Sequence, residues 1–248
     1  MGLILQDAPL IIPAGIVDLA SFRRWTLSDE FPQRGRIDYI HGQIEVDISP
    51  ANIWRHSGLK SILGMDIGAL IRSQNLGQVF IDQTRVVSPV ADLSCEPDIL
   101  YVSWESLKSG RVVCRPAAKP SDALDQMEFE GGPELVVEVV SPSSVAKDTQ
   151  RLPPAYFSAG VREFWLADAR VQEAKLIIHA RGRAGFEPVV IDAQGYQRSE
   201  VLGELFKLTC KPGPVANTLV FNATQTISFC ELSEHAEFHA RRTIQGTP

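Results

Sequence analysis

The stretch that decides the fold of this chain is ELVVEVVSPSSVAKDTQRLPPAYFSAGVREFWLADAR, residues 134–170. Its apolar run at 135–140 predicts a buried strand, and the Ser and Pro residues that follow predict a turn. A short helix is expected at 153–159, because two prolines are tolerated in a first helical turn but not deeper, and Gly160 can end it. A second strand with an aromatic core is expected at 163–167.

Upstream, the sequence predicts a hairpin followed by a long helix. Residues 37–48 alternate apolar and polar around a His41-Gly42 turn, which is typical of two antiparallel strands. Asn52 is a candidate helix cap, and apolar residues then recur at helical spacing to about residue 73. Other short elements are expected as a helix capped by Asp18 and as strands at 78–81, 84–87, 98–102, 174–179 and 187–191.

The overall order predicts a mixed α/β (α+β) fold with a central sheet flanked by helices. Residues 105–132 carry the turn signals Lys108-Ser-Gly-Arg111, Pro116 and Lys119-Pro-Ser-Asp122 and predict an insertion, with a small hairpin, between two core strands. We expect a lead-in over residues 1–30, one domain over 31–210, and a less patterned C-terminal extension over 211–248.

Composition limits the class of protein. The 248 residues are 44% hydrophobic and carry a net charge of -6, which is typical of a globular chain and unlike a basic nucleic-acid coat protein. Residues 141–185 nevertheless hold seven Lys or Arg against four Asp or Glu. No apolar run approaches twenty residues, so no membrane span is predicted, and the N-terminus does not read as a signal peptide. The four cysteines form no CxxC pair, which argues against a zinc knuckle and favours free thiols.

Glu138 needs an explanation, because it lies in the middle of the apolar strand. A buried, ionised carboxylate costs several kcal/mol unless it is paired or binds a metal. Asp98 follows Pro97 at the mouth of another apolar strand. If the two strands are neighbours, both carboxylates face one point and need a cation between them, for which a hard divalent ion such as magnesium is suited. The simpler alternative is a Glu at a strand end that is bridged to an Arg.

Two further groups would complete such a site. A third acid from the hairpin, Glu45 or Asp47, could join the cluster. A positive side chain is expected near the attacking water, where it would hold the water and stabilise negative charge.

Four strings together resemble the Uma-two family of restriction endonucleases, within the PD-(D/E)XK nuclease-like superfamily. They are EPDILYV at 96–102, ELVVEVVSPSSVAKDT at 134–149, YFSAGVREFWLADAR at 156–170 and DYIHGQIEVDISP at 38–50. The resemblance covers about residues 30–210. It implies a restriction-endonuclease-like fold, a Mg²⁺ or Mn²⁺ site, DNA as the substrate, and a cytoplasmic homodimer.

The resemblance also implies site residues. The Pro-Asp acid of the family matches Asp98, and the glutamate of its apolar strand matches Glu138. An acid or polar group from the N-terminal hairpin and helix is usual, and the candidates here are Glu45 and His56. The implied metal ligands are therefore Asp98 and Glu138, with Glu45 as the third.

The basic residue departs from the family pattern. The superfamily lysine often lies two positions after the glutamate, where this chain has Val140. Many family members instead carry it in an Asp-x-x-x-Lys pattern, and counting from Asp148 places it at Leu152. We expect Lys147, or second Arg151, to reach the site from an irregular turn before the two prolines.

Two hypotheses follow. The first is a metal-dependent DNA endonuclease that hydrolyses phosphodiester bonds with a metal-activated water, and the presence of Asp98 and Glu138 favours it. The second is a catalytically inactive module of the same fold that binds nucleic acid or a protein partner, and the displaced lysine and the acidic net charge favour it. Tyr156 and Trp165 are interpreted as core aromatics.

Overall fold

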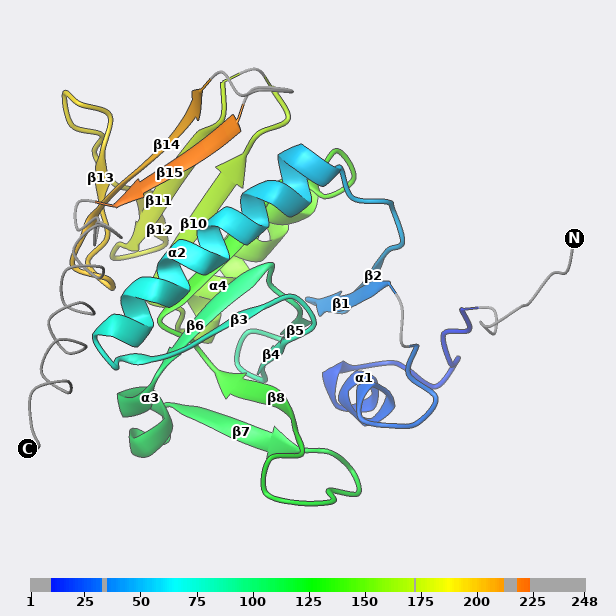
Figure 1. Cartoon of the computed structure of the whole chain (residues 1–248). Helices are drawn as coiled ribbons and strands as arrows, with labels where there is room; N and C mark the ends of the chain where they lie inside the picture. Colours follow the sequence, from blue (N-terminus) through cyan, green and yellow to red (C-terminus); the bar gives the residue numbers. More distant parts are fainter. Residues whose placement is uncertain (1–9, 33–34, 172, 212–217, 224–248) are drawn as a thin grey trace, which may run out of the picture.

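A computed structural model describes residues 10–32, 35–171, 173–211 and 218–223, and these form an α+β fold (Figure 1). The strands form two six-stranded mixed sheets and one three-stranded sheet. The predicted mixed class is confirmed, although the strands are divided among three sheets.

Residues 134–170 form the centre of one six-stranded sheet, whose order is β12-β11-β10-β9-β6-β3. Strands β9 (Leu135–Val139) and β10 (Glu163–Asp168) are parallel neighbours, connected through α4 (Leu152–Ala159). The other strands of this sheet are β3 (Gly77–Ile81), β6 (Ile99–Ser103), β11 (Lys175–Arg181) and β12 (Phe186–Pro188).

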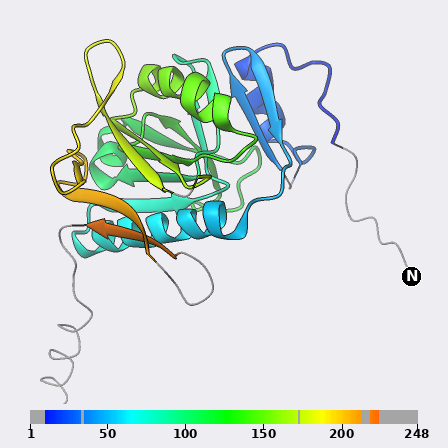
Figure 2. The same ribbon diagram turned by 90° about the horizontal axis from the view of Figure 1, so that it is seen from above.

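Both faces of β9 are buried, which explains why its sequence is almost continuously apolar. Leu135, Val137 and Val139 belong to the core that includes α2 (Leu59–Ser73), whereas Val136 packs with residues of α4. Figure 2 shows the two helices, α2 in cyan and α4 in light green, on opposite sides of the sheet. Because side chains alternate along a strand, Glu138 lies on the α4 side.

The connection from β9 to α4 contains a π-helical turn, η2 (Lys147–Arg151), that runs directly into α4. The predicted irregular segment is thus a wide helical turn rather than an open loop. Pro153 and Pro154 cannot donate the N–H groups that a regular α-helical turn before them would need. The wide turn buries the side chains of Lys147 and Asp148.

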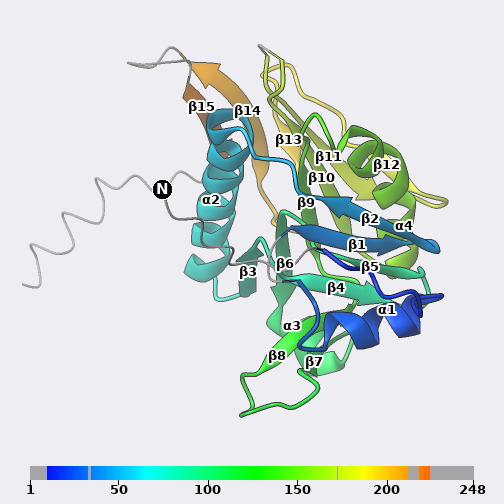
Figure 3. The same cartoon turned by 90° about the vertical axis from the view of Figure 1, so that its right-hand side faces the viewer.

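The second six-stranded sheet has the order β2-β1-β5-β4-β8-β7. The predicted hairpin is confirmed as β1 (Arg36–Ile40) and β2 (Gln43–Asp47), and both turn residues, His41 and Gly42, have positive φ. Figure 3 shows this hairpin in front of β9 and β6. The remaining strands are β4 (Arg85–Ser88), β5 (Leu93–Cys95), β7 (Val112–Pro116) and β8 (Gln126–Gly131).

The predicted insertion at 105–132 holds the expected hairpin, β7–β8, after a short helix, α3 (Trp104–Ser109). Strand β8 also pairs in parallel with β4, so the hairpin extends a sheet of the core. The expected caps are present as well. Asp18 caps α1 (Leu19–Thr26), and the side chain of Asn52 accepts hydrogen bonds at the start of η1 (Ile53–Gly58), a π-helical turn that leads into α2.

The third sheet consists of β13 (Gln197–Arg198), β14 (Leu205–Lys211) and β15 (Thr218–Ala223). Its Phe206 and Phe221 pack against Trp165, which is fully buried as a core aromatic. Residues 218–223 therefore join the core, although their sequence shows little pattern. Among the described residues, Cys95, Cys114 and Cys210 are free thiols, and no helix is long and apolar enough to cross a membrane. Cys230 lies outside the described residues.

Candidate active site

Two buried carboxylates lie opposite each other on adjacent strands. Strands β6 and β9 are antiparallel, with Ile99 paired to Val137. Asp98, one residue before β6, therefore comes opposite Glu138, and directly opposed residues share a face of the sheet. Asp98 is 1% exposed and Glu138 is 0% exposed. The strands that carry the two predicted acids are therefore neighbours, as the sequence argument required.

Side chains from three elements surround Asp98, and two of them, Arg36 and Lys60, are positively charged. Its Oδ1 accepts a hydrogen bond from Arg36 Nη2 at 2.5 Å and lies 2.9 Å from Lys60 Nζ. Its Oδ2 accepts from the backbone N–H of Val139 at 2.7 Å, and His56 Nε2 lies 3.8 Å away. Burial opposes ionisation of Asp98, but the charges of Arg36 and Lys60 outweigh it and hold the pKa well below its ordinary value.

Glu138 has one satisfied oxygen and one unsatisfied oxygen. The hydroxyl of Tyr156 donates to Oε1 at 2.5 Å, whereas Oε2 is buried and has no hydrogen-bond partner among the described residues. Arg36 Nη1 lies 3.9 Å from Oε2. Burial, followed by the charges of Asp98 and Asp148, raises the pKa of Glu138 to about 8. The guanidinium of Arg36 thus lies between the two carboxylates, as a cation shared by both.

This raised pKa predicts that Glu138→Gln stabilises the metal-free protein, and more so at alkaline pH. The folded pKa of about 8 exceeds the ordinary value of 4.5, so folding retains a proton that the unfolded chain loses between these values. The free energy of unfolding therefore falls by up to about 1.4 kcal/mol per pH unit as the pH rises through this window. Gln carries no such proton.

Melting temperatures of wild type and Glu138→Gln in EDTA test this expectation. The advantage of the variant should grow from about pH 5 to about pH 8.5, since the penalty in wild type is complete only above the folded pKa. An advantage that stays constant over this range would contradict the pKa assigned to Glu138.

Lys147 is buried beside the hairpin. Its Nζ donates to Asp38 Oδ2 at 3.0 Å, and Asp38 Oδ1 accepts from the backbone N–H of Glu96 at 3.0 Å. Burial opposes the charge on Lys147, but Asp38 and Glu138 outweigh it and raise the pKa of the amine. The neighbouring Asp148 is also buried, which raises its pKa to about 6, and the hydroxyl of Ser144 donates to its Oδ2 at 2.5 Å.

Glu45 and Arg151 lie farther out and pair with each other. Arg151 Nη2 donates to Glu45 Oε2 at 2.7 Å, and its Nε donates to the other oxygen. In the hairpin register Glu45 is opposite Asp38, but it belongs to β2, the edge strand, whereas Asp38 belongs to β1, which lies between β2 and β5. No three His, Cys, Asp or Glu side chains within the described residues are arranged to bind one metal ion, so the expected three-acid set is not assembled.

Sequence reasoning missed four residues of this cluster: Arg36, Asp38, Lys60 and Tyr156 as a hydrogen-bond donor. Arg36 and Asp38 are two positions apart on one strand and so share a face. Lys60 follows His56 by four residues, which places both on one side of the helix. These spacings were the available signals. Lys60 Nζ also lies 2.6 Å from Asp82, which is held at a positive φ in the turn between β3 and β4.

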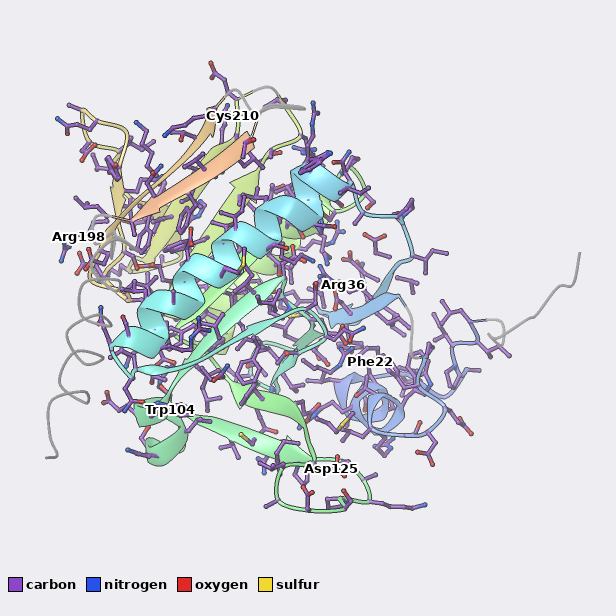
Figure 4. All side chains as sticks on the ribbon, viewed as in Figure 1. Phe22, Arg36, Trp104, Asp125, Arg198 and Cys210 are labelled. Atoms are coloured by element: carbon purple, nitrogen blue, oxygen red, sulfur yellow. The ribbon has the colours of Figure 1, made fainter. Side chains whose placement is uncertain are left out.

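A cleft of about 550 Å³ opens beside the acids. Arg36 and His56, which contact or approach Asp98, form part of its wall, and the Ser-Pro-Ser-Ser turn after β9 forms another part. Figure 4 shows Arg36 near the β1 hairpin, below the start of α2. Asp98 and Glu138 do not line this positively charged cleft themselves, and they adjoin it through Arg36 and His56.

Comparisons with known proteins identify a family and a similar fold. A family named Uma2, described as "Putative restriction endonuclease", matches residues 19–210. The fold is similar to the crystal structure of "a putative nuclease belonging to DUF820" from Anabaena variabilis ATCC 29413. That likeness has a TM-score of 0.55 and 18% sequence identity, and it covers 75% of this chain and 91% of the other. No match is found among curated proteins.

Proposed function

The chain belongs to the Uma2 (Uma-two) family, and from this membership we propose that it is a metal-dependent endonuclease that hydrolyses phosphodiester bonds in DNA. The observation that carries the proposal is the pair of buried carboxylates, Asp98 and Glu138, opposed across β6 and β9 beside an arginine-lined cleft. Nothing in the packing of a strand requires two acids at this point, because each costs free energy to bury.

The donor set fits a divalent cation such as Mg²⁺ or Mn²⁺. Glu138 offers an unused, buried oxygen, and the guanidinium of Arg36 already lies as a cation between the two acids. Asp98 and Glu138 would hold the metal, because hard cations bind carboxylate oxygens. When bound, the ion would act as a Lewis acid and lower the pKa of a water molecule that it coordinates. Glu45 would have to leave Arg151 to become a third ligand, so we do not assign it to the metal.

The chain's own residues orient the acids and supply positive charge. The N–H of Val139 fixes Asp98, and the hydroxyl of Tyr156 fixes one oxygen of Glu138. Lys147 is buried and held by Asp38, and we assign it the stabilisation of negative charge that develops on the phosphate. Arg151 is about two-fifths exposed and bound to Glu45, so it is the weaker candidate.

An inactive module that binds nucleic acid is the second candidate function. Arg36 and Lys60 already neutralise Asp98 without a metal, and Val140 and Leu152 occupy the positions where family members carry lysine. On this alternative the basic side chains would be permanent partners of the acids. The two functions differ in whether a divalent cation displaces Arg36 from between the carboxylates.

The test is metal-dependent cleavage. Purified protein is incubated with supercoiled plasmid and with single-stranded DNA in Mg²⁺, in Mn²⁺ and in EDTA, and metal binding is measured by calorimetry. We expect cleavage that requires the metal, and we expect this activity to elute with the protein through two chromatographic steps. Metal binding without cleavage would favour the inactive module, and the absence of both would reject the metal site.

A further inference from the structure

An exposed tryptophan lies next to the candidate active site. Trp54 is 66% exposed, and its neighbour Ile53 is 73% exposed. The other tryptophans are more covered: Trp104 is 37% exposed, Trp25 5% and Trp165 0%. Packing therefore accounts for the other three aromatic rings far better than for Trp54.

The chain geometry at the start of α2 links Trp54 to the acids. The Asn52 side chain accepts hydrogen bonds from the N–H groups of Trp54 and Arg55, and this cap fixes the direction of the π-helical turn. Trp54 is left in solvent, while His56, two residues later, turns inward to 3.8 Å from Asp98. The indole and His56, which approaches Asp98, thus belong to the same capped turn.

Two adjoining cavities lead from the neighbourhood of the acids to Trp54. The cleft beside the acids shares Asn52 and Arg55 with a second cavity of about 530 Å³. Trp54, Ile62, Val171 and Leu219 form much of the wall of this second cavity, which is mainly apolar. We call the exposed part of this wall, formed by Trp54 and Arg55, the Trp54 surface.

The charges along the two cavities favour an anionic ligand. The whole chain carries a net charge of -6, yet the walls hold three arginines, Arg36, Arg55 and Arg170, against one acid, Asp47. Arg36 is offset by Asp98 at 2.5 Å and Arg170 by Asp168 at 2.8 Å, which leaves the charge of Arg55. Arg55 donates to the backbone oxygen of Arg170 and forms no ion pair with any carboxylate that the structure describes. A guanidinium with unused donors beside an exposed indole suits a phosphate followed by an aromatic ring.

We infer that the Trp54 surface binds an unpaired nucleobase beside the scissile phosphate, so that the substrate is single-stranded or locally opened DNA. The inference rests on the proposed nuclease function and names its substrate class. A base can stack on an indole only when its face is free, whereas an intact duplex presents base edges and phosphates. A second copy of this chain is a poorer occupant, because a two-fold contact through this surface would bring the arginines of both copies into one interface.

Binding measured in EDTA tests the inference without cleavage. A single-stranded oligonucleotide and the matching duplex are titrated into wild type, Trp54→Ala and Trp104→Ala, with binding followed by anisotropy of labelled DNA and by tryptophan fluorescence. Trp104 is a matched control, because it is partly exposed and lies apart from Arg36, at the lower left of Figure 4. Trp54→Ala should weaken single-strand binding about tenfold or more and remove the fluorescence quenching, since base stacking contributes strongly to such complexes.

Duplex binding by Trp54→Ala, and both affinities of Trp104→Ala, should stay within about threefold of wild type, as phosphate contacts do not depend on these rings. Equal weakening for single strand and duplex, or none, would overturn the inference. So would loss of a dimer in Trp54→Ala with unchanged DNA binding, which would assign the surface to a second copy.

Cleavage separates this inference from the proposed function. Duplex cleavage in Mg²⁺ that is insensitive to Trp54→Ala would support the nuclease function and reject this inference. Trp54-dependent binding without any cleavage would reject the nuclease and retain the surface.

Discussion

Asp98→Asn and Glu138→Gln are each expected to lower the rate of metal-dependent DNA cleavage by about 10³-fold or more. Each change keeps the size and most of the hydrogen bonding of the side chain but removes the negative charge that would hold the cation. In Asp98→Asn the amide oxygen can still accept from Arg36 and Lys60, while the backbone N–H of Val139 loses its acceptor. The rates are measured by single-turnover cleavage in Mg²⁺ and in Mn²⁺, with circular dichroism to verify folding.

Glu163→Gln is the matched control for these two variants. Glu163 is also a buried glutamate of the central sheet, 1% exposed, but its carboxylate accepts hydrogen bonds from Trp165 and Ser199 at the third-sheet side of β10. We expect it to cleave within about threefold of wild type, because its side chain lies on the Trp165 face of the sheet, opposite to the face of Glu138. Either site variant retaining a tenth of the wild-type rate would contradict the assignment of the acids.

The activity and stability of Glu138→Gln are expected to change in opposite directions. The variant should lose cleavage and, without metal, gain stability, because wild type bears the cost of a buried acid with one unsatisfied oxygen. A residue that lowers stability and is required for activity is the usual signature of a functional site. A structural glutamate would lose stability when its charge is removed.

Much of the fold was predictable because its signals are local. The apolar run of β9, the Asn52 cap and the His41-Gly42 turn each specify an element from a few neighbouring residues. Strand β5 has three residues, too few to show an alternation, and β15 is recognisable mainly from its pairing with β14. The division into sheets depends on long-range pairings, such as β8 with β4, that no local pattern encodes.

The candidate site was predictable to the same extent. Glu138 is visible in the sequence because a charge interrupts an apolar run, and Asp98 because it opens another. Asp38 is missed and Glu45, its register partner, is predicted, because the sequence does not show which hairpin strand is the inner one. Arg36 and Lys60 look like ordinary surface charges until β1 and α2 are placed beside Asp98.

Lys147→Met is expected to lower the cleavage rate by about 10²- to 10³-fold while metal affinity changes much less. Lys147 bonds Asp38 rather than the two predicted ligands, so its loss removes positive charge near the phosphate without removing a metal ligand. Arg151→Met is the comparison, because Arg151 is half-exposed and paired with Glu45, and it should cleave within about threefold of wild type. Lys60→Met is measured as well, because Lys60 lies 2.9 Å from Asp98 and is the other amine that could supply the positive charge.

A drop in rate for Lys147→Met alone is open to a structural explanation, because it leaves Asp38 buried without its partner, which costs about 3–5 kcal/mol of stability. The double variant Asp38→Asn/Lys147→Met removes both charges and should recover most of that stability. If Lys147 stabilises charge on the phosphate, the double variant stays slow although it is stably folded. If it recovers the wild-type rate, Lys147 serves only to neutralise Asp38, and the missing charge is supplied by Lys60 or Arg36. The ratio of rates between single and double variants therefore separates a chemical role from a packing role.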